Sequence, residues 1–267
     1  MAIITISRGS YCCGKAVAEE VAQRLGYQCI ARDIIVEACQ EFNVPEVKLV
    51  RAIHDAPSLL ERFMHGRDRY LAYFQAALLK HLKEDNAVYH GLAGQFCLPG
   101  IAHVLKVRIV ADMENRIRCE MERGGMDREE ALRLLEKDDE ERRKWSMYLF
   151  GVNIRDPNLY DLIINTEHVP ISLAAEIICE VVKTKPFQTT AESKRALDDL
   201  ALAAQVRAAL VNAKPDITVS VKGDVALLRA RHISPREESE LSKLACQVPG
   251  IKVARVESHE LSARFGT

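Results

Sequence analysis

The sequence is nearly neutral, has no long apolar run and has no regular cysteine pattern. Its 37 Lys and Arg residues balance 38 Asp and Glu residues, so the formal net charge of −1 gives no reason to expect a nucleic-acid partner. No stretch approaches the roughly 20 apolar residues that cross a bilayer. Met1 leads directly into a short apolar run without the features of a secretion signal. We therefore expect a cytoplasmic protein that lacks a transmembrane segment.

The eight cysteines contain no CxxC pair and no Cys/His cluster with the spacing of zinc ligands. This pattern predicts no metal site built from protein side chains. In a reducing compartment most of the cysteines should act as small apolar side chains.

With 267 residues, 48% of them hydrophobic, the chain is long enough for two domains. Up to about residue 184, short apolar runs alternate with helical patterns, beginning with a strand at 3–7 and a helix around 18–25. Further strands are expected at 87–89, 104–110 and 159–164. The alternation predicts an α/β fold with a parallel sheet flanked by helices. Two charged helical stretches, 57–83 and 127–148, have the composition of surface insertions.

Residues 185–195 lose the apolar period and collect Thr, Pro and Ser, which indicates a linker between domains 1–184 and 196–260. The second domain should contain a helix at 196–210, two strands around the turn Gly223-Asp224, a helix at 235–246 and a strand at 251–256. This αββαβ order is typical of a small α+β domain.

The most specific motif lies between the first expected strand and the first expected helix. It reads Gly9-Ser10-Tyr11-Cys12-Cys13-Gly14-Lys15. A Walker A loop has this context, because backbone N–H groups and a lysine ammonium bind nucleotide phosphates at a helix N-terminus. Ala16 follows, where Ser or Thr normally binds Mg²⁺ through its hydroxyl. Cys12 and Cys13 lie near a helix N-terminus that can lower a thiol pKa, so redox control is a second, less specific interpretation of this loop.

Several blocks in this order resemble the cytidylate kinase-like family, a branch of the P-loop nucleoside monophosphate kinases, over roughly residues 2–184. They are Ile4 to Arg8, Gly14-Lys15, Leu25-Gly26-Tyr27, Arg32 to Ile35, Val104 to Ala111, Arg116 to Arg118, Asp138 to Arg143, Phe150-Gly151, Asp156-Pro157 and Tyr160-Asp161. The resemblance implies a P-loop NTPase-type fold with a helical lid. It also implies phosphoryl transfer from ATP, with Mg²⁺, to a nucleoside monophosphate such as CMP or to a related small acceptor.

The resemblance further implies roles for individual residues. Lys15, Arg142 and Asp139 would be catalytic, with Asp139 also helping to hold the acceptor. The nucleotide phosphates would contact Gly9, Ser10, Tyr11, Cys12, Cys13, Gly14, Lys15, Ala16 and Arg143. The acceptor would contact Arg32, Asp33, Gly91, Arg118 and Arg155. A planar guanidinium suits these tasks because it binds phosphate oxygens in pairs. The alternative for the arginines is a solvated charged helix with i to i+4 pairs such as Glu129 with Arg133.

Three positions depart from the family pattern. Ala16 removes a metal ligand, Leu92 replaces an arginine expected to grip the acceptor, and Ala31 stands where Asp is common. These departures motivate a second hypothesis, a catalytically reduced nucleotide-binding sensor that signals through the C-terminal domain.

The C-terminal domain resembles a BON domain in its element order, in the turn at Gly223 and in the segment Val248 to Ile251. The resemblance implies an unidentified small ligand for this domain. Self-association into a homo-oligomer through the same domain is a further hypothesis.

Overall fold

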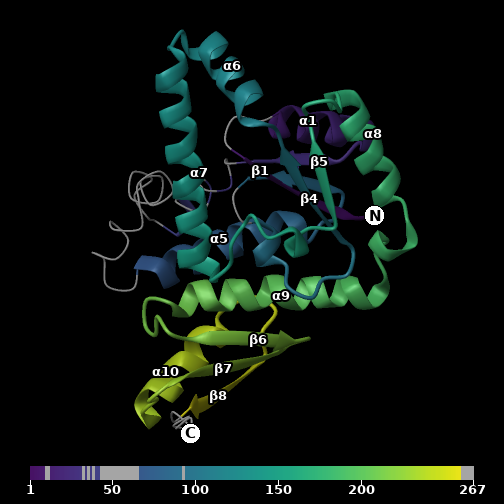
Figure 1. Cartoon of the computed structure of the whole chain (residues 1–267). Coiled ribbons are helices and arrows are strands. Elements are labelled where there is room, and N and C mark those ends of the chain that lie inside the picture. Colours follow the sequence, from purple (N-terminus) through teal and green to yellow (C-terminus); the bar gives the residue numbers. More distant parts are fainter. Residues whose placement is uncertain are drawn as a thin grey trace, which may run out of the picture.

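The computed structural model describes residues 1–9, 13–31, 34, 37, 40–42, 66–91 and 94–259. Their main part is a parallel five-stranded sheet in the order β2-β3-β1-β4-β5, with helices on both faces (Figure 1). Its strands are β1 (Ile3–Arg8), β2 (Gln28–Ile30), β3 (Ala87–His90), β4 (Val104–Val110) and β5 (Leu162–Asn165). The predicted α/β class is confirmed, although the last of these strands begins at Leu162 because the short helix η2 (Pro157–Leu159) precedes it.

The central strand β1 places the site residues that follow it. Ile3 lies opposite Ala87 of β3 and Val104 of β4, and both pairings are parallel. The carboxyl ends of the three strands therefore meet at one edge of the sheet. Ligands of open α/β sheets bind outside this edge, so the loops after Arg8, His90 and Val110 are where a ligand is expected.

One face of the sheet is covered by α1 (Gly14–Leu25) and α8 (Ile171–Val182). Alternate strand residues such as Ile4 and Ile6 point to this face and are almost completely buried. The helical spacing of Val17, Ala18 and Val21 puts all three against the strands.

The other face is covered by α5 (Gly66–Leu82), whose side chains from Leu71 to Phe74 and from Ala76 to Leu79 are buried. The expectation that the stretch 57–83 is a surface insertion was wrong for the described residues 66–82. The reason is that a second layer, α9 (Ala191–Leu210), covers the side of α5 that would otherwise face water (Figure 1).

Two antiparallel helices, α6 (Met113–Gly124) and α7 (Arg128–Phe150), form a projection above the sheet (Figure 1). Ile117, Ala131 and Leu135 make a small core between them. The N-terminus of α7 is fixed by a capping box of Asp127 and Glu130, and its last turns enter the main core through Trp145 and Leu149. This projection is the predicted helical lid.

The C-terminal part has the predicted αββαβ order. A separate three-stranded sheet contains β6 (Thr218–Lys222), β7 (Val225–Arg231) and β8 (Val253–His259), with β6–β7 antiparallel and β7–β8 parallel. Helices α9 and α10 (Pro235–Cys246) cover one of its faces. Helix α9 begins at Ala191 rather than Ala196, because Thr190 and Ser193 form a capping box inside the predicted linker. The short helix η3 (Lys185–Phe187) lies in the same segment.

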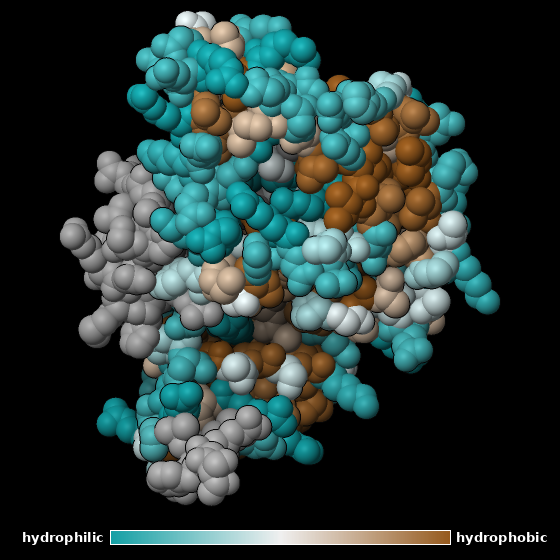
Figure 2. Space-filling view, in the orientation of Figure 1, coloured by the Kyte–Doolittle hydropathy of each residue, from teal (hydrophilic) through white to brown (hydrophobic). Residues whose placement is uncertain are grey.

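Figure 2 shows two different surfaces on one side of the molecule. Hydrophobic side chains gather over α8 and β5, where Ile163 and Leu173 are each 43% exposed. Hydrophilic side chains cover the area between α7 and β4, at the edge of the sheet where a ligand is expected. Among the described helices, none combines the length and the apolar character needed to cross a membrane.

Candidate nucleotide-binding site

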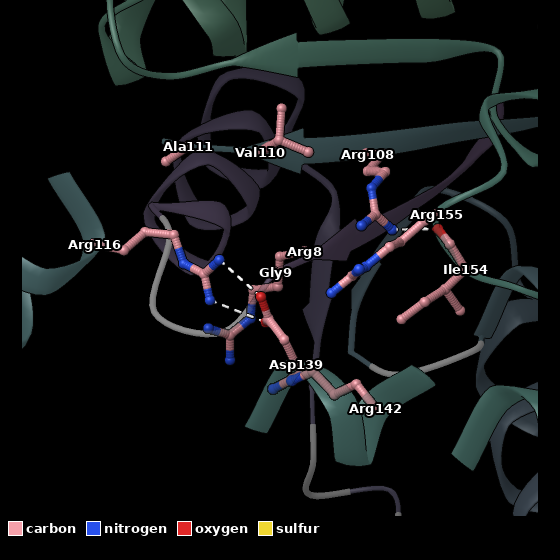
Figure 3. A pocket seen from close by; sticks show the side chains of 10 residues that line it. All are labelled: Arg8, Gly9, Arg108, Val110, Ala111, Arg116, Asp139, Arg142, Ile154 and Arg155. Carbon is pink, nitrogen blue, oxygen red and sulfur yellow. Dashed lines mark hydrogen bonds and ion pairs between the residues drawn. The ribbon is translucent and has the colours of Figure 1, made fainter. Parts of the chain in front are cut away.

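A cavity of about 70 Å³ lies at the carboxyl edge of β1 and β4, under the lid. Its polar lining consists of the side chains of Arg8, Arg108, Arg116, Asp139, Arg142 and Arg155. The remaining lining residues are Gly9, Val110, Ala111 and Ile154. Figure 3 shows these side chains converging from the strands, the lid and the segment after the lid. A cavity with so many guanidinium groups favours an anion of high charge.

Gly9, the first residue of the predicted phosphate-binding loop, lines this cavity, and Gly14 at the N-terminus of α1 packs against Arg8, another lining residue. Cys13 precedes the helix, and its side chain makes no capping hydrogen bond. The first turn also contains no acidic residue. The partial positive charge of this helix end is therefore not offset by the helix's own side chains, which suits a phosphate.

Position 14 has room only for glycine, because the side chain of Arg8, the last residue of β1, packs against it. A Cβ atom on Gly14 would lie 2.7 Å from Cβ of Arg8 and 2.9 Å from its Cδ. The aliphatic part of the Arg8 side chain thus lies directly over Gly14. The Nε of Arg8 is buried without a hydrogen-bond partner among the described residues. The Walker glycine therefore also allows a strand arginine to reach the cavity.

Arg108 enters the cavity from β4 and is held by neutral groups. Its Nη1 donates to the carbonyl of Ile154 at 2.5 Å and to the hydroxyl of Tyr160 at 3.0 Å. Its guanidinium lies 5.3 Å from the centroid of the Tyr160 ring, and that hydroxyl also donates to the Ile154 carbonyl at 2.9 Å. These contacts orient Arg108 without cancelling its charge.

Arg116 of α6 and Asp139 of α7 form a bidentate pair. The two N–O distances are 2.8 and 2.9 Å, and the side chains are 8% and 17% exposed (Figure 3). Both carboxylate oxygens of Asp139 are therefore occupied by one guanidinium. Arg142, one turn further along α7, and Arg155, after the lid, complete the cationic lining.

Other predicted residues lie outside this lining. Lys15 is exposed and pairs with Glu19 at 3.6 Å, and Arg143 pairs with Glu140 at 2.7 Å. The Arg143 guanidinium lowers the pKa of Glu140 to about 2. Arg118 is exposed and donates to the side chain of Asn115. On α7 the predicted pair of Glu129 with Arg133 is present at 3.2 Å.

Gly91 and Gly94 surround the ring of Tyr89 at the end of β3. A Cβ on Gly91 would lie 2.5 Å from the Tyr89 hydroxyl, and one on Gly94 would overlap the ring. Glycine is therefore needed here for packing. Ser10, Tyr11, Cys12, Arg32, Asp33 and Leu92 lie outside the described residues.

A protein-bound Mg²⁺, as the P-loop kinase fold implies, does not fit the described residues. Ala16 has no oxygen in its side chain, and both oxygens of Asp139, the carboxylate of the cavity, bind Arg116. Asp112, next to the cavity residue Ala111, caps α6 by accepting the N–H of Asn115 at 3.1 Å. Among the residues that the structure describes, no group of three or more His, Cys, Asp or Glu side chains is suited to hold a metal.

The sequence reasoning did not assign Arg8, Arg108 or Arg116 to a site, although the structure brings all three to the cavity. A signal for Arg108 was present. It is a charged residue near the carboxyl end of a strand that is otherwise largely apolar, and that end faces the ligand edge of a parallel sheet.

Comparison with known proteins agrees with this arrangement. The cytidylate kinase-like family model matches residues 3–168. A cytidylate kinase from Thermoplasma volcanium is 32% identical over 84 residues, which are 31% of this chain and 44% of that protein. A cytidylate kinase from Thermococcus kodakarensis is 33% identical over 86 residues, 32% of this chain and 44% of that protein. The match thus spans less than half the length of these curated relatives.

A solved structure has the same fold over this region. The crystal structure of an uncharacterized protein from Eubacterium ventriosum superposes with a TM-score of 0.54 at 18% identity, covering 68% of this chain and 97% of that chain. The family match extends from β1 through β5 and includes the whole lid. This chain therefore belongs to the cytidylate kinase-like family.

Proposed function

We propose that the protein transfers a phosphoryl group from ATP to a nucleoside monophosphate or a related small acceptor. The observation that carries the proposal is the convergence of strand and lid arginines on one cavity, whose Arg8 packs against the N-terminus of α1. Phosphoryl transfer depends mainly on positioning and on neutralising charge that spreads over the transferring group. Guanidinium groups supplied from several elements meet both needs.

In this proposal the loop after β1 and Lys15 hold the β and γ phosphates of ATP. Lys15 first leaves Glu19, and this exchange is easy because the two side chains are 64% and 55% exposed and such surface pairs are weak. An acceptor oxygen attacks the γ phosphorus while the bond to the bridging β oxygen breaks, and ADP leaves. Arg142 offsets the charge on the transferring group, and closure of the lid excludes water that would otherwise hydrolyse ATP.

Asp139 and Arg116 bind each other across the lid hairpin in the structure. We propose that this pair fixes the orientation of the α7 turn that carries Arg142. A role for Asp139 in holding the acceptor would require it to leave Arg116. Arg155, which lines the same cavity, is the described residue best positioned for the acceptor phosphate.

An assay with ATP, Mg²⁺ and a panel of nucleoside monophosphates and other small acceptors tests the proposal. We expect ADP formation that depends on one acceptor class and that Lys15→Ala abolishes. Arg133→Ala, which removes an exposed pair on the lid, is the matched control and should leave turnover unchanged. A folded sample that turns over no acceptor refutes the transfer activity.

One observation favours a second candidate, the nucleotide sensor. Helix α9 contributes Leu197 and Ala204 to the main core and Leu210 to the core of the C-terminal domain. We propose that this domain is BON-like, supported by its αββαβ order, and that it reads the nucleotide state through α9. Calorimetry that detects nucleotide binding, with no product in the acceptor panel, is the result that selects the sensor over the enzyme.

A further inference from the structure

Mg²⁺ usually serves P-loop kinases by neutralising phosphate charge, and a hydroxyl after the Walker lysine usually ligates it. This chain has Ala16 at that position. The described cavity offers no carboxylate oxygen in exchange, because Arg116 takes both oxygens of Asp139. The charge of a bound polyphosphate must therefore be balanced by other groups of the protein.

The arginines of the cavity are arranged for this task. Among the described residues, Arg8, Arg108 and Arg155 all line the cavity and none of them forms an ion pair. The Nε of Arg8 is buried and has no hydrogen-bond partner in the described structure. A buried N–H donor without a partner is costly, and an anion in the cavity would satisfy it.

Arg108 differs from the lid arginines in being attached to a central strand. The Ile154 carbonyl and the Tyr160 hydroxyl hold its guanidinium at 2.5 and 3.0 Å, and Tyr160 lies 3.3 Å from Ser7 of β1. Both partners are neutral, so the positive charge stays available. A pre-oriented cation at a fixed place loses little conformational entropy when it binds phosphate.

From this geometry we propose that Arg108, with Arg8, replaces a protein-ligated Mg²⁺ as the counter-charge of the polyphosphate, so that the protein binds ATP without a divalent metal. The proposal rests on the proposed function, since it assigns the same cavity to ATP phosphates. It predicts that, in contrast to a metal-ligating P-loop, this site binds ATP about equally well with and without the metal. ATP without its metal carries more negative charge than its magnesium complex, and the cavity is rich in cations.

Calorimetric titration of ATP into the full chain, once with Mg²⁺ and once with EDTA, tests the proposal. We expect the wild-type Kd in EDTA to lie within about 3-fold of the Kd in Mg²⁺, because no side chain in the described lining of the cavity is available to ligate the metal. Arg108→Gln should weaken binding in EDTA by about 10-fold or more, the effect of losing a charged hydrogen bond. Tyr160→Phe keeps the arginine but removes one of its fixed partners, and should weaken binding by a smaller factor.

Arg133→Gln, which removes an exposed lid guanidinium that pairs with Glu129 outside the cavity, is the matched control and should bind like wild type. Ala16→Ser adds the missing hydroxyl and should make binding stronger in Mg²⁺ than in EDTA. Binding of ATP by the wild type only when Mg²⁺ is present overturns the inference and leaves the proposed function standing. An Arg108→Gln variant that unfolds at the wild-type temperature and binds like wild type in EDTA also overturns it. A wild type that binds ATP in neither buffer refutes the proposed function itself.

Discussion

The ion pair of Arg116 with Asp139 allows a sharp test of the cavity. Asp139→Asn keeps the size of the side chain but removes its charge, so the largely buried Arg116 loses the carboxylate with which it forms a bidentate pair. The two side chains are 8% and 17% exposed, and their N–O distances are 2.8 and 2.9 Å. Breaking a fully buried pair costs about 3–5 kcal/mol, and partial exposure reduces this, so we expect a loss of about 2 kcal/mol in the free energy of unfolding.

Urea denaturation monitored by the fluorescence of Trp145 measures this loss. Inorganic phosphate should then restore part of the stability of Asp139→Asn, because the anion can bind the guanidinium in place of the lost carboxylate. The wild type should gain less from phosphate, since its Arg116 is already paired. Asp138→Asn, on the same turn, is the control and should change stability by no more than about 0.5 kcal/mol.

Two outcomes refute this reasoning. An unchanged free energy of unfolding in Asp139→Asn means that the pair contributes nothing and that the lid turn is held by other contacts. If phosphate raises the free energy of unfolding of the variant and of the wild type by the same amount, Arg116 is not accessible from the cavity.

Two further predictions concern the core. Burial raises the pKa of the Cys97 thiol from its ordinary 9.0 to about 12, so the unfolded chain releases this proton first as the pH rises. Ionisation of this thiol in the unfolded chain should therefore lower the free energy of unfolding by about 1.4 kcal/mol per pH unit above pH 9. The variant Cys97→Ala should not show this decrease. Parallel pH profiles of stability for the variant and the wild type would contradict the prediction. A chain that ends at Thr184 loses Leu197 and Val211 from the main core, which at about 1.5–3 kcal/mol per buried side chain lowers stability by roughly 3–6 kcal/mol. An unfolding midpoint equal to that of the full chain disproves this second prediction.

Four of the five strands could be predicted because each is a short apolar run that ends at a polar or glycine-rich segment, whereas β2 (Gln28–Ile30) was missed because it is short and two of its three residues are exposed. The run at 104–110 is an example, and it matches β4 residue for residue. The walls of the cavity could not be predicted in the same way. Whether a lid arginine lines the cavity or pairs with a glutamate depends on the rotation of α7: Arg142 lines the cavity, whereas the adjacent Arg143 pairs with Glu140.

The burial of α5 could not be predicted from the sequence pattern either. Its polar residues, such as Gln75 and Asp68, suggested exposure to water. In the structure both lie near Arg207 of α9, at 3.1 Å and 3.9 Å respectively. A helix that binds a second helix through polar contacts has the composition of a surface helix although much of it is buried. Periodicity reports how apolar a face is, but it does not report what covers the opposite face.

The position of α9 decides how the two parts of the chain can influence each other. A polar linker such as 185–195 would let them move independently, and ligand binding in one would then leave the other unchanged. The helix instead begins inside that segment, packs on α5 through one side and on the small sheet through the other. Because packed cores resist small deformations, α9 can shift only by repacking both. A ligand of the C-terminal sheet that favours one position of α9 must therefore change how α9 packs against α5. The sensor hypothesis needs such a physical connection, and the enzyme hypothesis is compatible with it.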